Sequence, residues 1–226
     1  MDSSAFLNLL TASDNPVLPA SIAMRWALHG VWALVLGTGS LLLTVKLKRP
    51  YRLGLSLMVM AWTLVPGSVS PAYWLGLAFQ TPSLTSAAIC LVWLWRAWRS
   101  RNGQVQDQLR VQAPGRLGLV GIAFGWMLLL DTFAWLPVSV YAWGFSSAAV
   151  GTMAVLVMLL LIAFASTGTN QSRSDRLGSV LIIVVLTIFV LTRVPTGNLW
   201  DALIDPWLWA GLQACWLVNA LSATRA

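Results

Sequence analysis

The side chains of this chain that could do acid–base or ion-binding chemistry are few, and they lie near the ends of long apolar stretches. Arg25 and His29 are four residues apart, so they share one face of a helix. Asp131 stands in the apolar run MLLLDTFAWLP, and Asp201 and Asp205 come just before the last apolar stretch. A charge inside a membrane is costly, so an ionisable residue there is a candidate for function. The functional reading is a polar cluster in which Asp131 pairs with Arg25 or His29 and serves a proton, an ion or a polar ligand, although we favour the structural role described next.

A structural role for the same residues is the alternative. Arginines near helix ends extend their charge to the interface, and aspartates cap helices. Asp205 followed by Pro206 is a typical helix start, with aspartate as N-cap and proline as the first helical residue. Asp131 has no such capping position and is the residue to mutate first.

A second polar stretch, AFQTPSLTS, interrupts the apolar residues 71–98. If these residues form one helix, Gln80, Thr81 and Ser83 lie near the middle of a bilayer, where Pro82 kinks the helix and frees a backbone carbonyl, as at transporter sites. The other reading takes Thr81 as an N-cap and Pro82 as the first residue of a new helix, with residues 71–80 at the outer interface. We favour a helix start, and either reading adds these three polar residues to the candidate ligand site.

Several function classes are excluded by missing residue types. The only lysines, Lys46 and Lys48, lie in a loop, so a retinal Schiff base in a late helix is excluded. The chain has no Glu and a single His, so bis-histidine haem and multi-histidine metal sites are excluded as well. Cys90 and Cys215 lie inside apolar stretches without the spacing of a metal or redox motif. We expect no metal, no cofactor and no catalytic residues, and enzyme activity is disfavoured.

The elements that must position these residues are membrane helices. Hydrophobic residues make up 58% of the 226 residues and charged residues 9%, against about 25% charged in a soluble domain. A helix crosses a bilayer with about 20 apolar residues. We predict one all-α transmembrane bundle with seven spans, at approximately residues 19–45, 53–68, 71–98 (kinked, or starting at 82), 117–136, 138–164, 177–191 and 206–221.

The placement of basic residues predicts the orientation of this bundle. If seven spans alternate, 12 of the 14 Lys and Arg residues fall on one side, including those of the basic loop 99–116. Only Arg25 and Arg193 fall on the other side. Cytoplasmic loops carry this excess of positive charge, so we predict an outside N-terminus and a cytoplasmic C-terminus. Trp93, Trp95 and Trp98 lie at a predicted inner end, where indoles anchor to the interface.

Small residues indicate where helices approach closely. Gly118, Gly121 and Gly125 lie near one face of the fourth predicted span, and Ser147 and Gly151 are four apart in the fifth. Such spacing lets helix backbones pack closely in lipid. We expect tight packing of these two faces, either with each other or with a partner chain.

These features lead to three expectations for function. The first is a non-catalytic membrane subunit or an assembly or accessory factor that packs against partner helices in the inner (plasma) membrane of a bacterium. The second is a small transporter or permease with a polar site near the outer leaflet. The third is an envelope enzyme that acts on a lipid-linked substrate with Asp131 and His29 as acid and base. The expected partners are the bilayer and another membrane protein or a second copy of the chain, but not nucleic acid.

Overall fold

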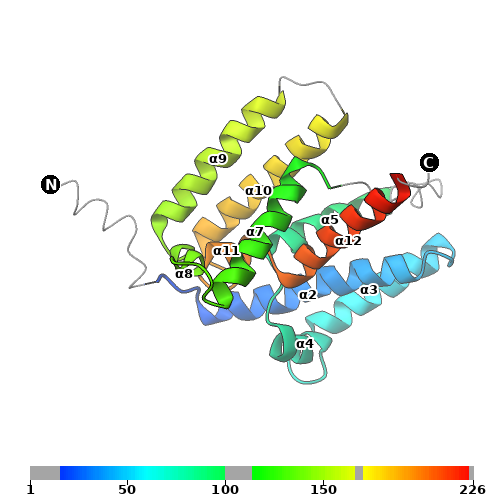
Figure 1. Cartoon of the computed structure of the whole chain (residues 1–226). Coiled ribbons are helices and arrows are strands. Elements are labelled where there is room, and N and C mark those ends of the chain that lie inside the picture. The colour runs from blue at the N-terminus through cyan, green and yellow to red at the C-terminus, as the bar shows by residue number, and fades with distance from the viewer. Residues whose placement is uncertain (1–15, 100–113, 166–169, 224–226) are drawn as a thin grey trace.

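Every regular element that the computed structural model describes, over residues 16–99, 114–165 and 170–223, is a helix (Figure 1). The elements in chain order are α2 (Ser21–Leu43), α3 (Arg49–Leu64), α4 (Pro71–Phe79), α5 (Leu84–Arg99), α7 (Arg116–Thr132), α8 (Val140–Trp143), α9 (Ser147–Ala165), α10 (Asn170–Thr192), α11 (Leu199–Leu203) and α12 (Pro206–Ala223). The predicted all-α class is confirmed for these ranges. Most of the predicted basic loop 99–116 lies outside the described residues.

A helix lies in each of the seven predicted apolar segments, but several bounds differ: α3 is shifted four residues toward the N-terminus, α7 ends four residues early and α10 begins seven residues early. The third and fifth segments also differ in organisation. The third segment is not one kinked helix, because it divides into α4 and α5 with residues 80–83 between them. The start of α5 differs by two residues from the predicted start at Pro82, because Ser83 and not Thr81 caps the helix. The fifth segment begins at Ser147 rather than at residue 138, and the short helix α8 precedes it.

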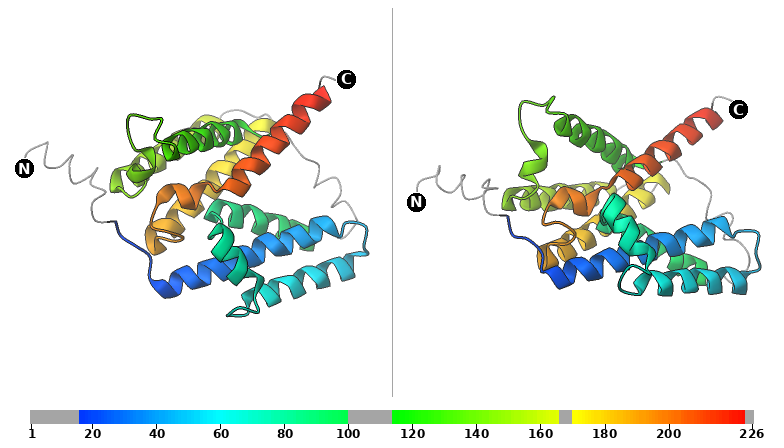
Figure 2. Two further views of the ribbon diagram at one scale, coloured as in Figure 1. Left: turned by 60° about the horizontal axis from the view of Figure 1, so that its bottom comes forward. Right: turned by 90° about the horizontal axis from the view of Figure 1, so that it is seen from below.

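The first half of the chain packs around α2. Ser56 Oγ of α3 donates to the Gly37 carbonyl at 2.8 Å, and His29 Nδ1 lies 2.9 Å from the Thr63 carbonyl, so α3 runs antiparallel to α2. Thr38 Oγ1 is 3.4 Å from the Cys90 carbonyl, and α5 runs parallel to α2. Figure 2 shows α2 and α3 side by side, with α4 lying across them.

The second half of the chain adds two antiparallel pairs, α9 with α10 and α7 with α12 (Figures 1 and 2). The pairing of α7 with α12 uses the predicted glycine face. A Cβ on Gly125 would lie 2.2 Å from Trp209 Cδ1, and the indole Nε1 of Trp209 donates to the Ile122 carbonyl at 3.1 Å. Gly118 and Gly121 face Leu212 in the same way. The small face of the fourth segment therefore receives α12 rather than the fifth segment.

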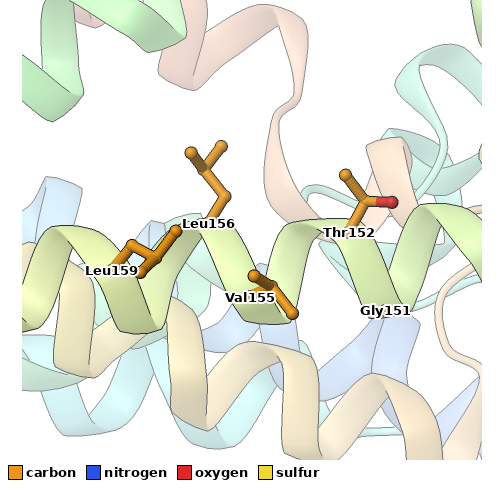
Figure 3. A pocket seen from close by; sticks show the side chains of 5 residues that line it. All are labelled: Gly151, Thr152, Val155, Leu156 and Leu159. Carbon is orange, nitrogen blue, oxygen red and sulfur yellow. The ribbon is translucent and has the colours of Figure 1, made fainter.

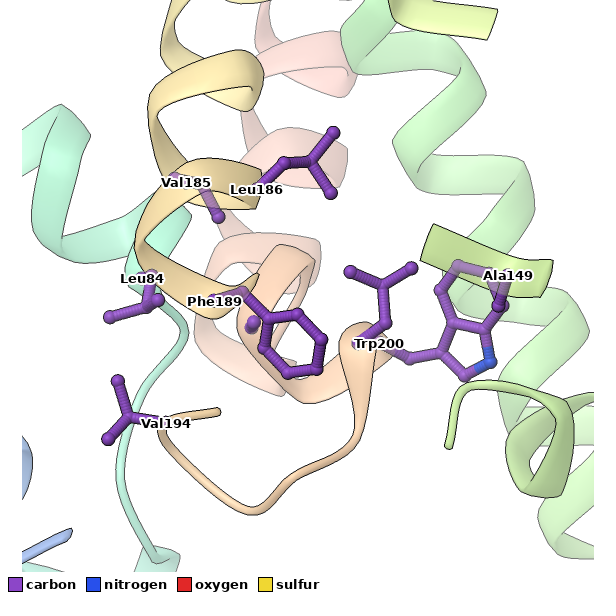
Figure 4. Packing of buried hydrophobic residues seen from close by; sticks show 9 residues of the cluster. Leu84, Ala149, Val185, Leu186, Phe189, Val194 and Trp200 are labelled. Carbon is purple, nitrogen blue, oxygen red and sulfur yellow. The ribbon is translucent and has the colours of Figure 1, made fainter. Parts of the chain in front are cut away.

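The apolar core lies where α5, α9, α10 and α11 meet. Phe189 and Leu199 are fully buried there, and Trp200 is 2% exposed (Figure 4). Burying an aromatic side chain is worth about 1.5–3 kcal/mol, so this cluster is the main packing contribution of the second half of the chain. This cluster lies next to the loops and short helices that carry the polar residues described below.

In the part of the chain that the structure describes, two helices are long and apolar enough to cross a membrane, Ser21–Leu43 and Asp175–Thr192. Ser147–Ala163 is apolar but shorter. Large apolar side chains are also exposed on several helices, for example Met58 on α3 and Ile162 on α9. These features are those of a membrane-associated helical protein.

Candidate functional site

The break between α4 and α5 meets the start of α12 at a buried carboxylate. Asp205 Oδ2 accepts hydrogen bonds from Ser83 N at 2.8 Å, Ser83 Oγ at 2.6 Å and Ser86 Oγ at 2.5 Å. Its other oxygen, Oδ1, accepts from the backbone N–H groups of Trp207 and Leu208, both at 2.9 Å. One side chain thus binds two helix starts that are 122 residues apart in the chain.

This arrangement makes Asp205 a shared cap for α5 and α12. The predicted N-cap role of Asp205 on α12 is confirmed. On the α5 side, the Ser83 carbonyl accepts from Ala87 N and the Ser83 hydroxyl accepts from Ser86 N, so Ser83 is the N-cap residue. A helix N-terminus carries about half a positive charge, so two of them favour an anion between them. With five donors on two oxygens, the carboxylate of Asp205 binds helices and has little capacity left for substrate.

A second polar group lies on the connection between α7 and α9. Asp131 Oδ2 accepts from the backbone N–H of Tyr141 at 2.7 Å, and the Tyr141 hydroxyl donates to Asp201 Oδ2 at 2.8 Å. Asp201 also accepts from Thr196 Oγ1 at 2.5 Å. The buried amide of Asn198 donates from Nδ2 to the Tyr141 carbonyl at 2.9 Å. These bonds fasten α8 to the segment between α10 and α11.

The charge of Asp201 and the burial of the phenol change the acidity of Tyr141. Desolvation by burial is the larger cause, and the neighbouring carboxylate is the second; both raise the pKa of Tyr141. The phenol therefore stays protonated at neutral pH and acts as a hydrogen-bond donor rather than as a base.

Close backbone contact completes this group. A Cβ on Gly144 would lie 2.1 Å from Asn198 Oδ1, and the Leu199 N–H donates to the Gly144 carbonyl at 3.0 Å. Trp200 Nε1 donates to the Val140 carbonyl at 2.8 Å. Gly144 is needed here because any side chain would separate the two connections.

His29 takes part in a third polar group, between α2 and the end of α3. Its Nδ1 is 2.9 Å from the Thr63 carbonyl and 3.4 Å from Ser70 Oγ. Ser70 Oγ donates to the same carbonyl at 2.7 Å and accepts from Ala72 N, which caps α4. The imidazole and the serine together satisfy a carbonyl at the end of α3, which is a structural task.

The structure separates most of the predicted site residues. No hydrogen bond links Asp131 to His29, because Asp131 binds the connection before α9 and His29 binds the end of α3. Arg25 is exposed on α2. Gln80 is exposed, and its carbonyl accepts from Trp32 Nε1 at 2.9 Å. Of the predicted ligand-site residues, Ser83 is the one that meets a carboxylate, and its partner Asp205 was predicted only as a cap.

Sequence reasoning missed several members of these groups, namely Ser70, Ser86, Tyr141, Thr196 and Asn198. A local signal was present for some of them. Asn198 stands before Leu-Trp-Asp and accepts from Trp200 N at 2.8 Å, which is the pattern of an N-cap. For Tyr141 no local pattern points to Asp201, because the two residues are 60 positions apart.

Metal binding finds no support in the described part of the chain, where no three His, Cys or Asp side chains come together. A shallow, open groove of about 420 Å³ runs along α9 and is lined by Gly151, Thr152, Val155, Leu156 and Leu159. Figure 3 shows Thr152 and Leu156 projecting away from the neighbouring helix α10. A Cβ on Gly151 would meet nothing within 4 Å, so this predicted packing residue faces open space.

Comparison with known proteins gives no relative for this arrangement. No protein-family model, no curated protein and no solved structure matches the chain.

Proposed function

We propose that this chain is a multi-pass protein of the inner (plasma) membrane of a bacterium, with seven spans, an outside N-terminus and a cytoplasmic C-terminus. Support comes from the coincidence of helices with all seven predicted segments, and from the two helices that have the length and apolarity of a span. In this arrangement α4, α8 and α11 are short outer elements, not spans.

The distribution of polar contacts supports this orientation. The bonds of Asp131, Asp201 and Asp205 lie at the ends of helices that are predicted to face outward. At the opposite end, Arg49 Nη2 of α3 donates to the Trp98 carbonyl of α5 at 2.6 Å. Most basic residues thus lie at one end of the bundle, and Asp131, Asp201 and Asp205 lie at the other, while Asp175 lies on the basic side next to Gly115; this is the asymmetry of cytoplasmic and external loops.

Thiol labelling tests the orientation. In a chain with Cys90 and Cys215 replaced by alanine, Val138→Cys, at an exposed outer position, should react with an impermeant maleimide added to intact cells. Lys48→Cys, at an exposed inner position, should react only after permeabilisation. The reverse pattern would overturn the orientation.

We further propose that the protein is a non-catalytic membrane subunit or an assembly or accessory factor that packs against partner helices. The observation that carries this proposal is the use of the outer polar side chains in helix capping and loop fastening, with Asp205 accepting five hydrogen bonds. Such groups hold a bundle together, and the contact of Ser70 Oγ with His29 Nδ1 at 3.4 Å also serves to satisfy the Thr63 carbonyl. The open face of α9 offers a surface where a partner helix can pack.

Photocrosslinking in native membranes tests this role. A benzophenone amino acid at Val155, which is 61% exposed on the α9 groove, should give a discrete crosslinked protein band. The same probe at Val157, which is 1% exposed and two residues away, is the matched control and should give none. A band at twice the mass of the chain would identify a second copy as the partner. Absence of any protein band at Val155 would overturn the accessory role.

A small transporter is the second candidate, favoured by the interrupted helix between α4 and α5. Gln80 there has a φ of 61°, and discontinuous helices line many transporter sites. This candidate predicts that Asp131→Asn, His29→Ala and Gln80→Ala each fail to restore the phenotype of a strain without the protein, at normal protein abundance. If all three variants restore it fully, transport through this region is ruled out. The enzyme alternative has less support, because its acid and base, Asp131 and His29, bind different groups.

A further inference from the structure

The inner end of α2, α3 and α5 carries a concentrated positive charge. Lys46, Lys48, Arg49 and Arg52 lie within seven residues on the turn after α2 and the first turn of α3, and Arg96 and Arg99 end α5. The hydrogen bond from Arg49 to the Trp98 carbonyl joins these two segments. We call these six residues the inner basic cluster.

The described aspartates do not neutralise this cluster. Asp131, Asp201 and Asp205 bind groups at the opposite end of the bundle, and Asp175 lies against Gly115 at the start of α7. Among the described residues, repulsion between like charges is therefore offset only by solvent or by an external anion.

Two arginines of the cluster have buried donors without an acceptor. The Nε atoms of Arg49 and Arg52 are buried and make no hydrogen bond. Arg52 as a whole is only 6% exposed, and it lies one turn before Ser56 on the face of α3 that packs on α2. A buried donor without a partner costs about 1–3 kcal/mol, more when it is charged, so these guanidinium groups lack an anionic partner.

The neighbouring tryptophans indicate what this partner is. Trp95 and Trp98 are both more than half exposed at the end of α5, and the Arg99 guanidinium lies 5.0 Å from the Trp95 ring centroid. Exposed indoles mark the level of lipid headgroups. At that level the abundant anion is the phosphate of a phospholipid, and an arginine Nε–H with one Nη–H forms the fork that matches two phosphate oxygens.

We propose that the inner basic cluster binds the headgroup phosphate of an anionic phospholipid through Arg49 and Arg52. Arg49 and Arg52 supply the Nε–H donors that lack an acceptor, and the remaining four basic residues favour a headgroup with net negative charge. The site depends on the membrane placement proposed above but not on the accessory role.

Native mass spectrometry of the full-length protein in detergent tests the site. Titration with phosphatidylglycerol should show one lipid bound at least about tenfold more tightly than phosphatidylcholine. Arg49→Gln and Arg52→Gln should each weaken this binding at least about fivefold, and the double variant at least about 30-fold, because each variant loses both a positive charge and the guanidinium donors to the phosphate. Arg116→Gln is the matched control, because Arg116 is an exposed arginine outside the cluster, at the start of α7; it should change binding less than twofold.

Two further variants and one competitor separate the alternatives. Arg52→Lys keeps the charge and loses the fork, so it should also weaken binding severalfold; full affinity would show attraction by charge alone and would overturn the site. Inorganic phosphate and glycerol phosphate at millimolar concentration should leave the lipid bound, and displacement of the lipid would identify a soluble phosphate as the occupant. Equal binding of the two lipids, or equal losses in Arg116→Gln and Arg49→Gln, would also overturn the proposal.

Folding and membrane placement are read separately from lipid binding. Each variant is compared with the parent by helix content and elution volume, and if Arg52→Gln does not fold, the half-buried Arg49 decides the result. Extraction of the protein without detergent would contradict the membrane placement itself. Loss of lipid preference in a protein that still requires detergent would contradict this site only.

Discussion

Replacing Asp205 with asparagine separates the two caps that this carboxylate supplies. The amide oxygen of the variant can still accept from Trp207 N and Leu208 N and cap α12. The NH₂ group then faces Ser83 N, which is itself a donor. The hydroxyls of Ser83 and Ser86 can rotate to accept from the amide, but the backbone N–H cannot. The variant therefore keeps the cap of α12 and the Ser83 cap of α5, but it leaves the backbone N–H of Ser83 without an acceptor.

The expected cost follows from these bonds. The backbone N–H of Ser83 becomes a buried donor without an acceptor, which costs about 1–3 kcal/mol. Removing the negative charge between two helix starts adds a few tenths of a kcal/mol for each. We expect Asp205→Asn to lower the free energy of unfolding by about 2–3 kcal/mol. Asp205→Ala, which also removes the cap of α12, should cost about 1 kcal/mol more.

Thermal unfolding in detergent, followed by circular dichroism, measures the effect. For a chain of this size 1 kcal/mol corresponds to about 2–4 °C in Tm, so Asp205→Asn should lower Tm by roughly 4–12 °C. Asp131→Asn is the matched control, since Asp131 accepts a single backbone hydrogen bond at an exposed position and the amide oxygen can replace the carboxylate oxygen. We expect that control to shift Tm by less than about 2 °C, because surface changes cost within about 0.5 kcal/mol.

A double-mutant cycle of Asp205→Ala with Ser83→Ala examines the coupling through the Ser83 hydroxyl, which donates to Asp205 Oδ2 at 2.6 Å. If Asp205 acts through Ser83, the two changes together should cost less than the sum of the single changes. Equal Tm values for Asp205→Asn and Asp131→Asn, or strict additivity with Ser83→Ala, would refute the shared cap.

Two other substitutions test close contacts by the same measurement. Gly144→Ala should lower the free energy of unfolding by about 1–3 kcal/mol, because its Cβ would lie 2.1 Å from Asn198 Oδ1. Gly151→Ala is the control and should have no such effect, because a Cβ there would meet nothing within 4 Å. Equal costs for the two variants would contradict the close packing at Gly144. Trp32→Phe keeps an aromatic ring in a 4% exposed position but removes the donor to the Gln80 carbonyl, so it should lower the free energy of unfolding by about 1–3 kcal/mol. An unchanged Tm would show that this hydrogen bond does not stabilise the break between α4 and α5.

Much of the secondary structure could be predicted from residue types alone. Continuous apolar runs specify helices, because in an apolar environment the backbone N–H and C=O groups must hydrogen-bond within the same segment. Helices lie in all seven predicted runs. Capping chemistry is equally local, so Asp205 before Pro206 correctly marked the start of α12. The start of α5 was two residues off, because Thr81 and Ser83 are both good caps and only the contact with Asp205 selects Ser83.

The partners of the polar residues were not accessible from the sequence. In the sequence, Asp131 and His29 resemble an interacting pair, because both interrupt apolar runs near a predicted outer end. In the structure, Asp131 instead accepts from the Tyr141 N–H, and His29 binds the Thr63 carbonyl. A carboxylate or an imidazole can form a stabilising hydrogen bond with any suitable backbone group. The residue type therefore predicts that the side chain forms a hydrogen bond, but not with which partner.

By itself, then, the sequence determined the all-helical class and the approximate positions of the long helices, because these follow from local hydrophobicity and capping. Only the tertiary structure decided that α7 packs on α12, that α9 keeps an open face, and that the interrupted segment from Gln80 to Ser83 is tied to α12 by Asp205. The physical reason is that apolar side chains are spread around these helices, so hydrophobicity alone does not determine which helices pack together. Close glycine contacts and a few long-range hydrogen bonds make that selection, and neither has a local pattern.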